Sequence, residues 1–212
     1  MKKHLRALAL GLTLAVCIGS STAALAEAPA AQPAEGAVAV LRLYTTYHPK
    51  DNALVNIDGH VFLGISNVSD AGLEVGGLTL APGTGITVGT RGNRPEHAGL
   101  WYDLESYYCY FLPDFYPNLR CIQVSLNAEQ LACVNAALAQ ADKWSALNNC
   151  VSFVTAVWNA VCSDRLDLVL PTPEKLTEAM EQYEGKVTVD PDVPYDYIVY
   201  YGYPATPSRD YT

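Results

Sequence analysis

A cysteine in the first turn of a predicted helix is the residue best suited to chemistry in this 212-residue chain. Cys150 follows Asn148 and Asn149, and asparagine is a favoured residue for capping a helix start. Unpaired backbone N–H groups and the positive dipole end at a helix start favour thiolate over thiol. The same N–H groups can hold an oxyanion, so the position predicts a nucleophile for acyl transfer. The alternative is a structural cysteine, because Cys150 shares the apolar stripe of the helix with Val154 and Val161.

A cysteine nucleophile needs a base, and three of the chain's four histidines lie outside the N-terminal leader considered below. His60 begins a strand-like segment, 59–67, which is a rigid position from which an imidazole can be aimed. A strand histidine that only bonds a backbone carbonyl is the alternative. His48 lies in a turn-like segment and is expected to be a loop residue. His97 lies in a polar loop before an aromatic stretch, where it either orients another side chain or lies on the surface.

The elements that must position these residues follow from the hydrophobic pattern. A β-type pattern in short segments bounded by Gly, Asn, Asp or Pro predicts strands at 37–47, 59–67, 73–80, 85–90, 120–126 and 195–203. Helical spacing and start signals predict helices at 128–144, 150–161 and 173–183. We expect an antiparallel meander over 59–90 and close packing of the first two helices. Because strands precede helices, the fold class is α+β, an antiparallel sheet with a packed helical layer.

The order of the histidine strand and the cysteine helix resembles the circularly permuted branch of the papain-like, NlpC-type cysteine hydrolases, related to lecithin retinol acyltransferase. In permuted members the histidine strand comes first and an Asn-Cys helix follows. Here GHVFLGI (59–65) matches the strand and NNCVSFVTAVWNAV (148–161) matches the helix, so the resemblance covers about residues 58–162. It implies a permuted papain-like fold with Cys150 as nucleophile and His60 as general base.

The family also uses a third, polar residue that orients the imidazole, and no motif of this chain identifies it. His97, Glu74 and Glu96 are the candidates. We favour His97 as the third catalytic residue, because polar loop residues beside an aromatic cluster often line clefts.

Two classes of function follow from this pattern. The first is a secreted cysteine hydrolase that cleaves an amide bond, in a peptide or in a peptidoglycan-like cell-wall substrate, through a Cys150 thiolate and a His60 base. An acyltransferase acting on lipid is a variant of this idea. The second is an exported, non-catalytic binding or interaction module on the same scaffold, favoured by the tyrosines that crowd 107–110 and 195–203.

The N-terminus has the three parts of a secretory signal. Residues 1–26 combine a basic start, an apolar run over 8–18 and a small-residue exit at Ala26, which predicts export and cleavage. Lipoprotein processing at Cys17 is the competing interpretation. Residues 27–36 are expected to form a flexible linker, and 37–212 a single domain with a Tyr-rich C-terminal tail. No later segment is apolar enough to predict a membrane span.

The net charge and the cysteine content limit which ligands and which disulfides the chain is expected to have. The net charge is −9, and removing three basic and no acidic residues with the signal lowers it to −12, which argues against nucleic-acid binding. No CxxC or HxxxH spacing predicts a metal site, and we expect no cofactor. Cleavage leaves five cysteines, an odd number. We expect disulfides between Cys109 and Cys121 and between Cys133 and Cys162, with Cys150 free. The sequence does not determine the oligomeric state.

Overall fold

The structure, a computed structural model, describes residues 34–47, 59–92, 99–112, 114–141, 143–183, 187–189 and 191–211. All of these residues belong to one compact unit, Pro33–Thr212. The predicted signal peptide, most of the linker, His48, Glu96 and His97 lie outside the described residues.

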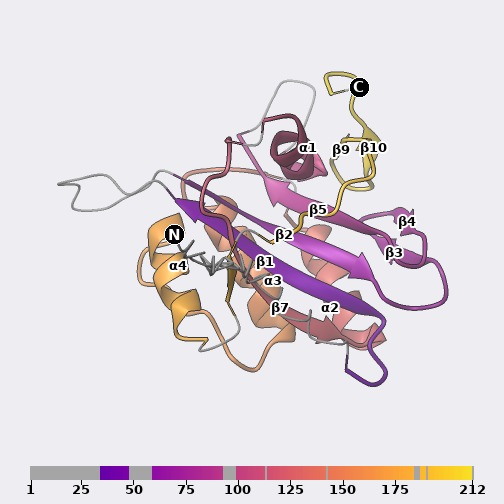
Figure 1. Cartoon of the computed structure of the whole chain (residues 1–212), viewed down its shortest axis with the longest axis horizontal. Coiled ribbons are helices and arrows are strands. Elements are labelled where there is room, and N and C mark those ends of the chain that lie inside the picture. Colours follow the sequence, from indigo (N-terminus) through magenta and orange to yellow (C-terminus); the bar gives the residue numbers. More distant parts are fainter. Residues whose placement is uncertain are drawn as a thin grey trace, which may run out of the picture. The chain divides into compact units, whose positions relative to one another are not determined.

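An antiparallel sheet forms the centre of the described fold (Figure 1). Within the described residues it has eight strands in the order β10-β9-β6-β5-β2-β1-β7-β8. The strands are β1 (Ala39–Tyr47), β2 (Gly59–Asn67), β5 (Gly85–Thr90), β6 (Leu100–Tyr102), β7 (Arg120–Leu126), β8 (Thr188–Val189), β9 (Tyr200–Tyr201) and β10 (Thr206–Pro207). Four helices accompany the described sheet, so the predicted α+β class with an antiparallel sheet is confirmed.

The central strand β1 fixes the register of its neighbours. It pairs with β2 on one side and with β7 on the other. Thr46 lies opposite His60 and Leu43 lies opposite Leu63, so His60 is held one residue inside the start of β2. A strand paired on both edges is a rigid support for a side chain that must keep its direction.

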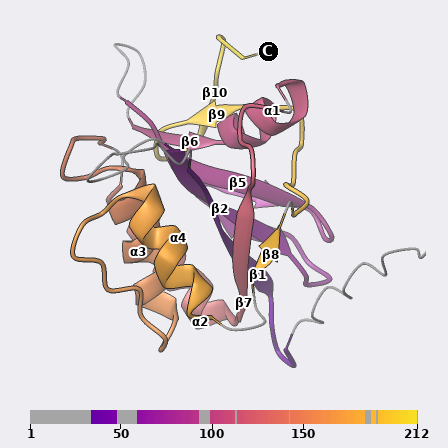
Figure 2. The same ribbon diagram turned by 60° about the vertical axis from the view of Figure 1, so that its left-hand side comes forward.

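Helices α2 (Ala128–Leu138), α3 (Cys150–Val161) and α4 (Pro173–Glu181) gather on one face of the sheet, as Figure 2 shows. Each begins at a side-chain cap, which satisfies backbone N–H groups that a helix start leaves unpaired. The cap residues are Asn127, Asn149 and Thr172. The predicted packing of the first two helices is confirmed, because α2 and α3 contact each other.

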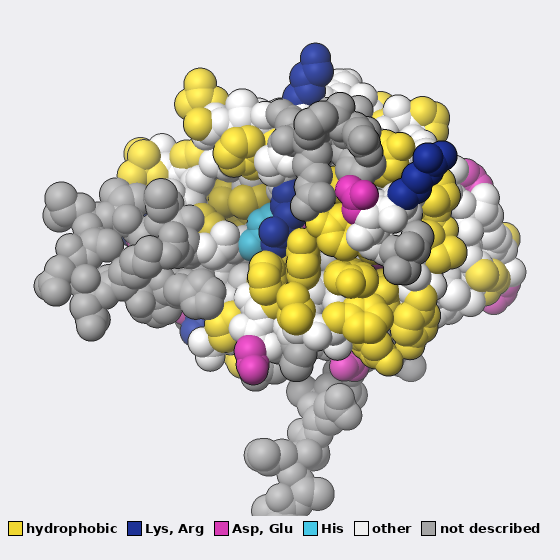
Figure 3. Space-filling model, turned by 90° about the horizontal axis from the view of Figure 1, so that it is seen from above, with side chains coloured by type: hydrophobic (Ala, Val, Ile, Leu, Met, Phe, Trp, Pro, Cys, Tyr) yellow, Lys and Arg dark blue, Asp and Glu magenta, His cyan; other side chains and the backbone are white. Residues whose placement is uncertain are grey.

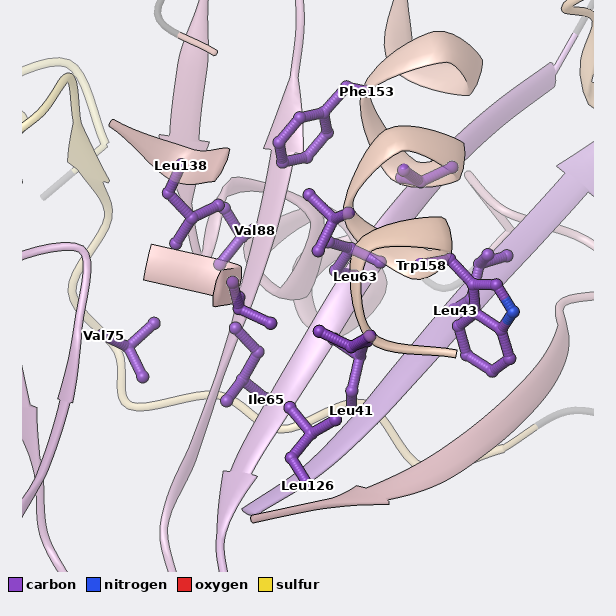
Figure 4. Packing of buried hydrophobic residues seen from close by; sticks show 14 of the residues in the cluster. Leu41, Leu43, Leu63, Ile65, Val75, Val88, Leu126, Leu138, Phe153 and Trp158 are labelled. Carbon is purple, nitrogen blue, oxygen red and sulfur yellow. The ribbon is translucent and has the colours of Figure 1, made fainter. Parts of the chain in front are cut away.

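Alternate residues of the central strands supply two hydrophobic layers, because successive strand side chains point to opposite faces. Leu43 and Leu63 are fully buried in the larger cluster, which includes Phe153 and Trp158 of α3 (Figure 4). Their neighbours Tyr44 and Phe62 belong to a second cluster with Tyr116, Leu119 and Cys121. Helix α1 (Leu104–Phe111) contributes Tyr108 and Cys109 to this second cluster.

The predicted meander over 59–90 is wrong. β2 pairs directly with β5, and the segment between them forms a separate hairpin of β3 (Leu73–Val75) and β4 (Leu78–Leu80). Gly76 and Gly77 cause the break, since both have a positive φ, of 62° and 87°, and turn the chain within the single strand predicted at 73–80.

Other boundaries also differ from those predicted. The first helix ends at Leu138 rather than near 144, because Leu138 is its last fully buried stripe residue and Trp144 lies 36% exposed. The stretch after residue 100 forms β6 and α1, which the sequence did not predict as elements. Within the predicted strand 195–203 only Tyr200–Tyr201 pairs with the sheet. Among the described residues, no helix has both the length and the apolar character needed to cross a membrane.

The close approach of Gly64 to Tyr44 generates a stability prediction. A Cβ at position 64 would lie 2.7 Å from Cε2 of the buried Tyr44 ring. Overfilling a packed core costs about 1–3 kcal/mol, and we expect Gly64→Ala to lower the free energy of unfolding by that amount. Urea denaturation measures it, with Gly92→Ala as the control, since a Cβ there meets nothing within 4 Å. Equal stability of the two variants would contradict this packing.

Candidate active site

Three side chains from three different elements meet at one end of β2. His60 is the second residue of β2, Cys150 is the first residue of α3, and Glu105 is the second residue of α1. Both predicted residues of the pair line the same groove, and His60 bonds Glu105 as well. The structure therefore brings together the predicted cysteine and histidine, and adds a carboxylate that sequence reasoning missed.

The start of α3 is fixed by the Asn149 side chain. Its Oδ1 accepts hydrogen bonds from the backbone N–H groups of Val151 and Ser152, both at 3.0 Å. Its Nδ2 donates to the carbonyl of Pro171 at 3.2 Å. One amide thus caps the helix and ties it to the segment that leads into α4, which holds the Cys150 backbone in place.

The surroundings of the Cys150 sulfur favour its anionic form. Burial alone would raise the pKa of the thiol, but hydrogen bonding and charge interaction with His60 outweigh it. The nearby backbone N–H groups of Val61 and Val151 also favour the anionic sulfur, and the pKa of Cys150 lies below its usual range.

The His60 imidazole shows the reciprocal effect. Burial alone would lower its pKa, yet the hydrogen bonds and charge interactions with Cys150 and Glu105 raise the pKa above its usual range. A lowered thiol pKa beside a raised imidazole pKa favours a thiolate–imidazolium pair.

Glu105 orients the imidazole. Its Oε1 lies 2.9 Å from His60 Nε2, and the glutamate side chain has no exposed surface. Nε2 is therefore engaged by the carboxylate, which leaves Nδ1 as the ring nitrogen for the sulfur. The sequence signal for Glu105 was weak: an acidic residue within an aromatic stretch, 45 positions from its partner.

The predicted third residue is not tested, because His97 and Glu96 lie outside the described residues. Glu74, the remaining candidate, lies in β3 of the separate hairpin. Its carboxylate accepts a hydrogen bond from Thr79, and the structure does not bring it to His60.

Gly89 in β5 makes room for the buried carboxylate. A Cβ at this position would lie 2.5 Å from Glu105 Oε1 and 2.7 Å from its Cδ. These contacts are closer than atoms tolerate, so only glycine lets α1 bring the carboxylate this near to the sheet.

Arg91 and Tyr116 surround the imidazole and carboxylate. Arg91 Nε lies 3.8 Å from Glu105 Oε1, and its guanidinium donates a hydrogen bond to the Tyr116 hydroxyl. The Tyr116 ring stacks on the His60 ring, with centroids 5.7 Å apart and an interplanar angle of 17°. This aromatic layer limits water access to one face of the imidazole.

The sulfur and imidazole border a groove of about 450 Å³. The described residues that line it are Gly59, His60, Thr90, Arg91, Gly92, Trp144, Ala146, Asn149, Cys150, Val151, Pro171, Thr172 and Pro173. On the face drawn in Figure 3, histidine and basic side chains lie together among hydrophobic ones. A groove beside a polarised thiol can admit an acyl substrate.

The other cysteines do not enter this site. Cys109, Cys121, Cys133 and Cys162 are free thiols in the structure, and among the described residues none lies at disulfide distance from another, so neither predicted pairing gains support. Burial raises the pKa of Cys109, Cys121 and Cys162 to about 12 in each case, which disfavours their thiolates. No group of three or more potential metal ligands is found in the described part of the chain.

No family model, curated protein or solved structure matches this chain. The resemblance to the permuted papain-like hydrolases therefore stays a prediction.

The thiolate–imidazolium pair generates a prediction about pH. Because the pKa of Cys150 is lowered, its thiolate persists as pH falls until the pH drops through that lowered value. We expect iodoacetamide to alkylate Cys150 at pH 6 far faster than Cys133, whose side chain is exposed on α2. A time course of alkylation, quenched at intervals and analysed by peptide mass spectrometry, measures both rates.

Glu105→Gln removes the negative charge that supports the imidazolium, so the Cys150 rate profile should move to higher pH. We expect a roughly tenfold slower reaction at pH 6. Glu181→Gln is the matched control, since Glu181 pairs with Arg120 on the surface. A profile that is the same in both variants would show that Glu105 does not tune the pair.

The contact between Gly89 and Glu105 gives a separate prediction. Gly89→Ala should displace the carboxylate and slow Cys150 alkylation at pH 6 by roughly tenfold, as Glu105→Gln does. In a Glu105→Ala background the carboxyl is gone, so adding Gly89→Ala should have little further effect. Additive losses in this double-mutant cycle would mean that Gly89 acts elsewhere.

Proposed function

We propose that this protein is a cysteine hydrolase that cleaves an amide bond by acyl transfer through Cys150. The observation that carries the proposal is that Cys150 and His60 interact at one groove while His60 is hydrogen-bonded to Glu105. A nucleophile bonded to a base, and a base oriented by a third group, is the arrangement that activates cysteine and serine nucleophiles on unrelated folds.

The proposed reaction begins with attack of the Cys150 thiolate on the substrate carbonyl, forming a C–S bond and a tetrahedral oxyanion. The backbone N–H of Cys150, which is not among the groups that Asn149 caps, is suited to bind that oxygen. As the intermediate collapses, the C–N bond breaks and the His60 imidazolium gives its proton to the leaving amine.

Water then attacks the thioester, and His60, now neutral, takes a proton from it. The carboxylic acid product leaves and the thiolate is restored, with the proton again on His60. Glu105 keeps the imidazole in one orientation throughout and stabilises its charged form, so it acts as a positioning residue.

We further propose that the fold is the permuted papain-like one. Its support is the element order, since β2 carries His60 and precedes α3, which carries Cys150 and contacts β2 and β5. The predicted signal at 1–26 supports an exported protein, for which a peptide or a peptidoglycan-like polymer is the proposed substrate.

The second candidate is a non-catalytic binding module, and one observation favours it. A cavity of about 290 Å³ lies outside the groove, and Tyr110, Tyr116 and Tyr195 are among its lining residues. Aromatic rings on a cavity wall can stack on sugar or peptide groups. A protein that binds such ligands but never acylates Cys150 would fit this candidate.

The hydrolase proposal predicts a covalent intermediate. Mixing the protein with p-nitrophenyl acetate should release a rapid burst of about one equivalent of p-nitrophenol per chain, as acetyl is transferred to Cys150. Cys150→Ser and His60→Asn should lower the acylation rate by roughly a thousandfold or more. The matched control is Cys133→Ser, which removes an exposed cysteine on α2.

Digestion of a peptide library and of soluble peptidoglycan fragments, followed by mass spectrometry, then identifies the amide that is cleaved. A burst that survives Cys150→Ser, or an acetyl group found on another residue, would overturn the proposed nucleophile.

A further inference from the structure

We propose that Arg91 binds a carboxylate of the substrate beside the reacting carbonyl, so that the preferred substrates carry an anionic group near the cleaved bond. The inference rests on the proposed function, because it assigns a substrate class to the same groove.

The charge of the groove differs in sign from that of the chain. The protein has 22 acidic and 13 basic residues. Yet none of the described residues lining the groove is acidic, and Arg91 is the one arginine or lysine among them. A cationic side chain in a groove whose described lining carries no carboxylate favours an anionic ligand, because the low-dielectric walls strengthen the attraction.

Arg91 is held firmly but not enclosed. Its guanidinium carbon lies 4.7 Å from the centroid of the Tyr108 ring and 5.5 Å from that of Phe115, and it donates to the Tyr116 hydroxyl. The side chain keeps 29% of its surface exposed. These contacts fix the guanidinium before a ligand arrives, which lowers the entropy lost on binding.

Glu105 does not occupy the hydrogen-bond donors of the Arg91 guanidinium. Glu105 Oε1 is bonded to His60 at 2.9 Å, whereas Arg91 Nε lies 3.8 Å away, which is beyond hydrogen-bonding distance. Nε is buried and has no hydrogen-bond partner among the described residues, so it is not the donor that a ligand in the groove would meet. A guanidinium has five N–H donors, and Arg91 gives one terminal N–H group to the Tyr116 hydroxyl. Its other terminal N–H groups are suited to bind a carboxylate in a bidentate manner.

Two matched pairs of alkylating reagents test the inference and do not require the natural substrate. Iodoacetate and iodoacetamide place a carboxylate or a neutral amide next to the reacting carbon. Iodoacetylglycine and iodoacetylglycinamide place the same groups further away. For each pair the ratio of the anionic to the neutral rate at Cys150 is compared with the ratio for glutathione at the same pH.

The expected result is a ratio about tenfold higher than that of glutathione for at least one pair, equivalent to about 1.4 kcal/mol. Arg91→Gln should return the ratio to the glutathione value. The control Arg165→Gln, on an arginine that pairs with Asp167 at an exposed position, should leave it unchanged.

Two results would overturn the inference while leaving the hydrolase intact. One is a ratio equal to that of glutathione for both pairs. The other is an Arg91→Gln variant that slows anionic and neutral reagents equally, which would make Arg91 a positioning residue for Glu105. Slow reaction of Cys150 with the neutral reagents, no faster than in the denatured chain, would instead contradict the proposed function itself.

Discussion

The contact between His60 and the fully buried Glu105 is the interaction on which the rest of the site depends. A carboxylate without exposed surface is costly unless a cation or donor offsets it, and His60 Nε2 at 2.9 Å does so. The same contact favours the imidazolium, which in turn favours the thiolate of Cys150. Through His60, a buried acid in an aromatic layer thus favours the anionic form of a sulfur on a different helix.

Parts of this arrangement could be predicted from sequence because local physics determined them. Asn149 before an apolar helical stripe indicated both the start of α3 and the place of Cys150. The strand-like segment 59–67, bounded by Gly59 and Asn67, indicated β2, and with it the rigid position of His60. Both signals lie within about a dozen residues, so tertiary packing had little opportunity to override them.

The other parts depend on contacts between distant segments. Helix α1 was missed because its start, Asp103, has a left-handed backbone with φ of 53° and makes no side-chain cap bond. Glu105 was missed because its meeting with His60 depends on that helix and on the space left by Gly89. The predicted meander is wrong because Gly76 and Gly77 form a turn where the hydrophobic pattern predicts a continuous strand.

The two hydrophobic layers contribute different members of the site. The nucleophile arrives with α3, which packs on the Leu43 and Leu63 face, whereas the carboxylate arrives with α1, which packs on the Tyr44 and Phe62 face. The imidazole belongs to the strand between them. Weaker packing of the helical layer would therefore displace the Cys150 sulfur. Weaker packing of the aromatic layer would leave the sulfur in place but would free the His60 imidazole from Glu105. Substitutions that disturb the helical face should therefore abolish the reactivity of the site, whereas substitutions that disturb the aromatic face should only weaken it.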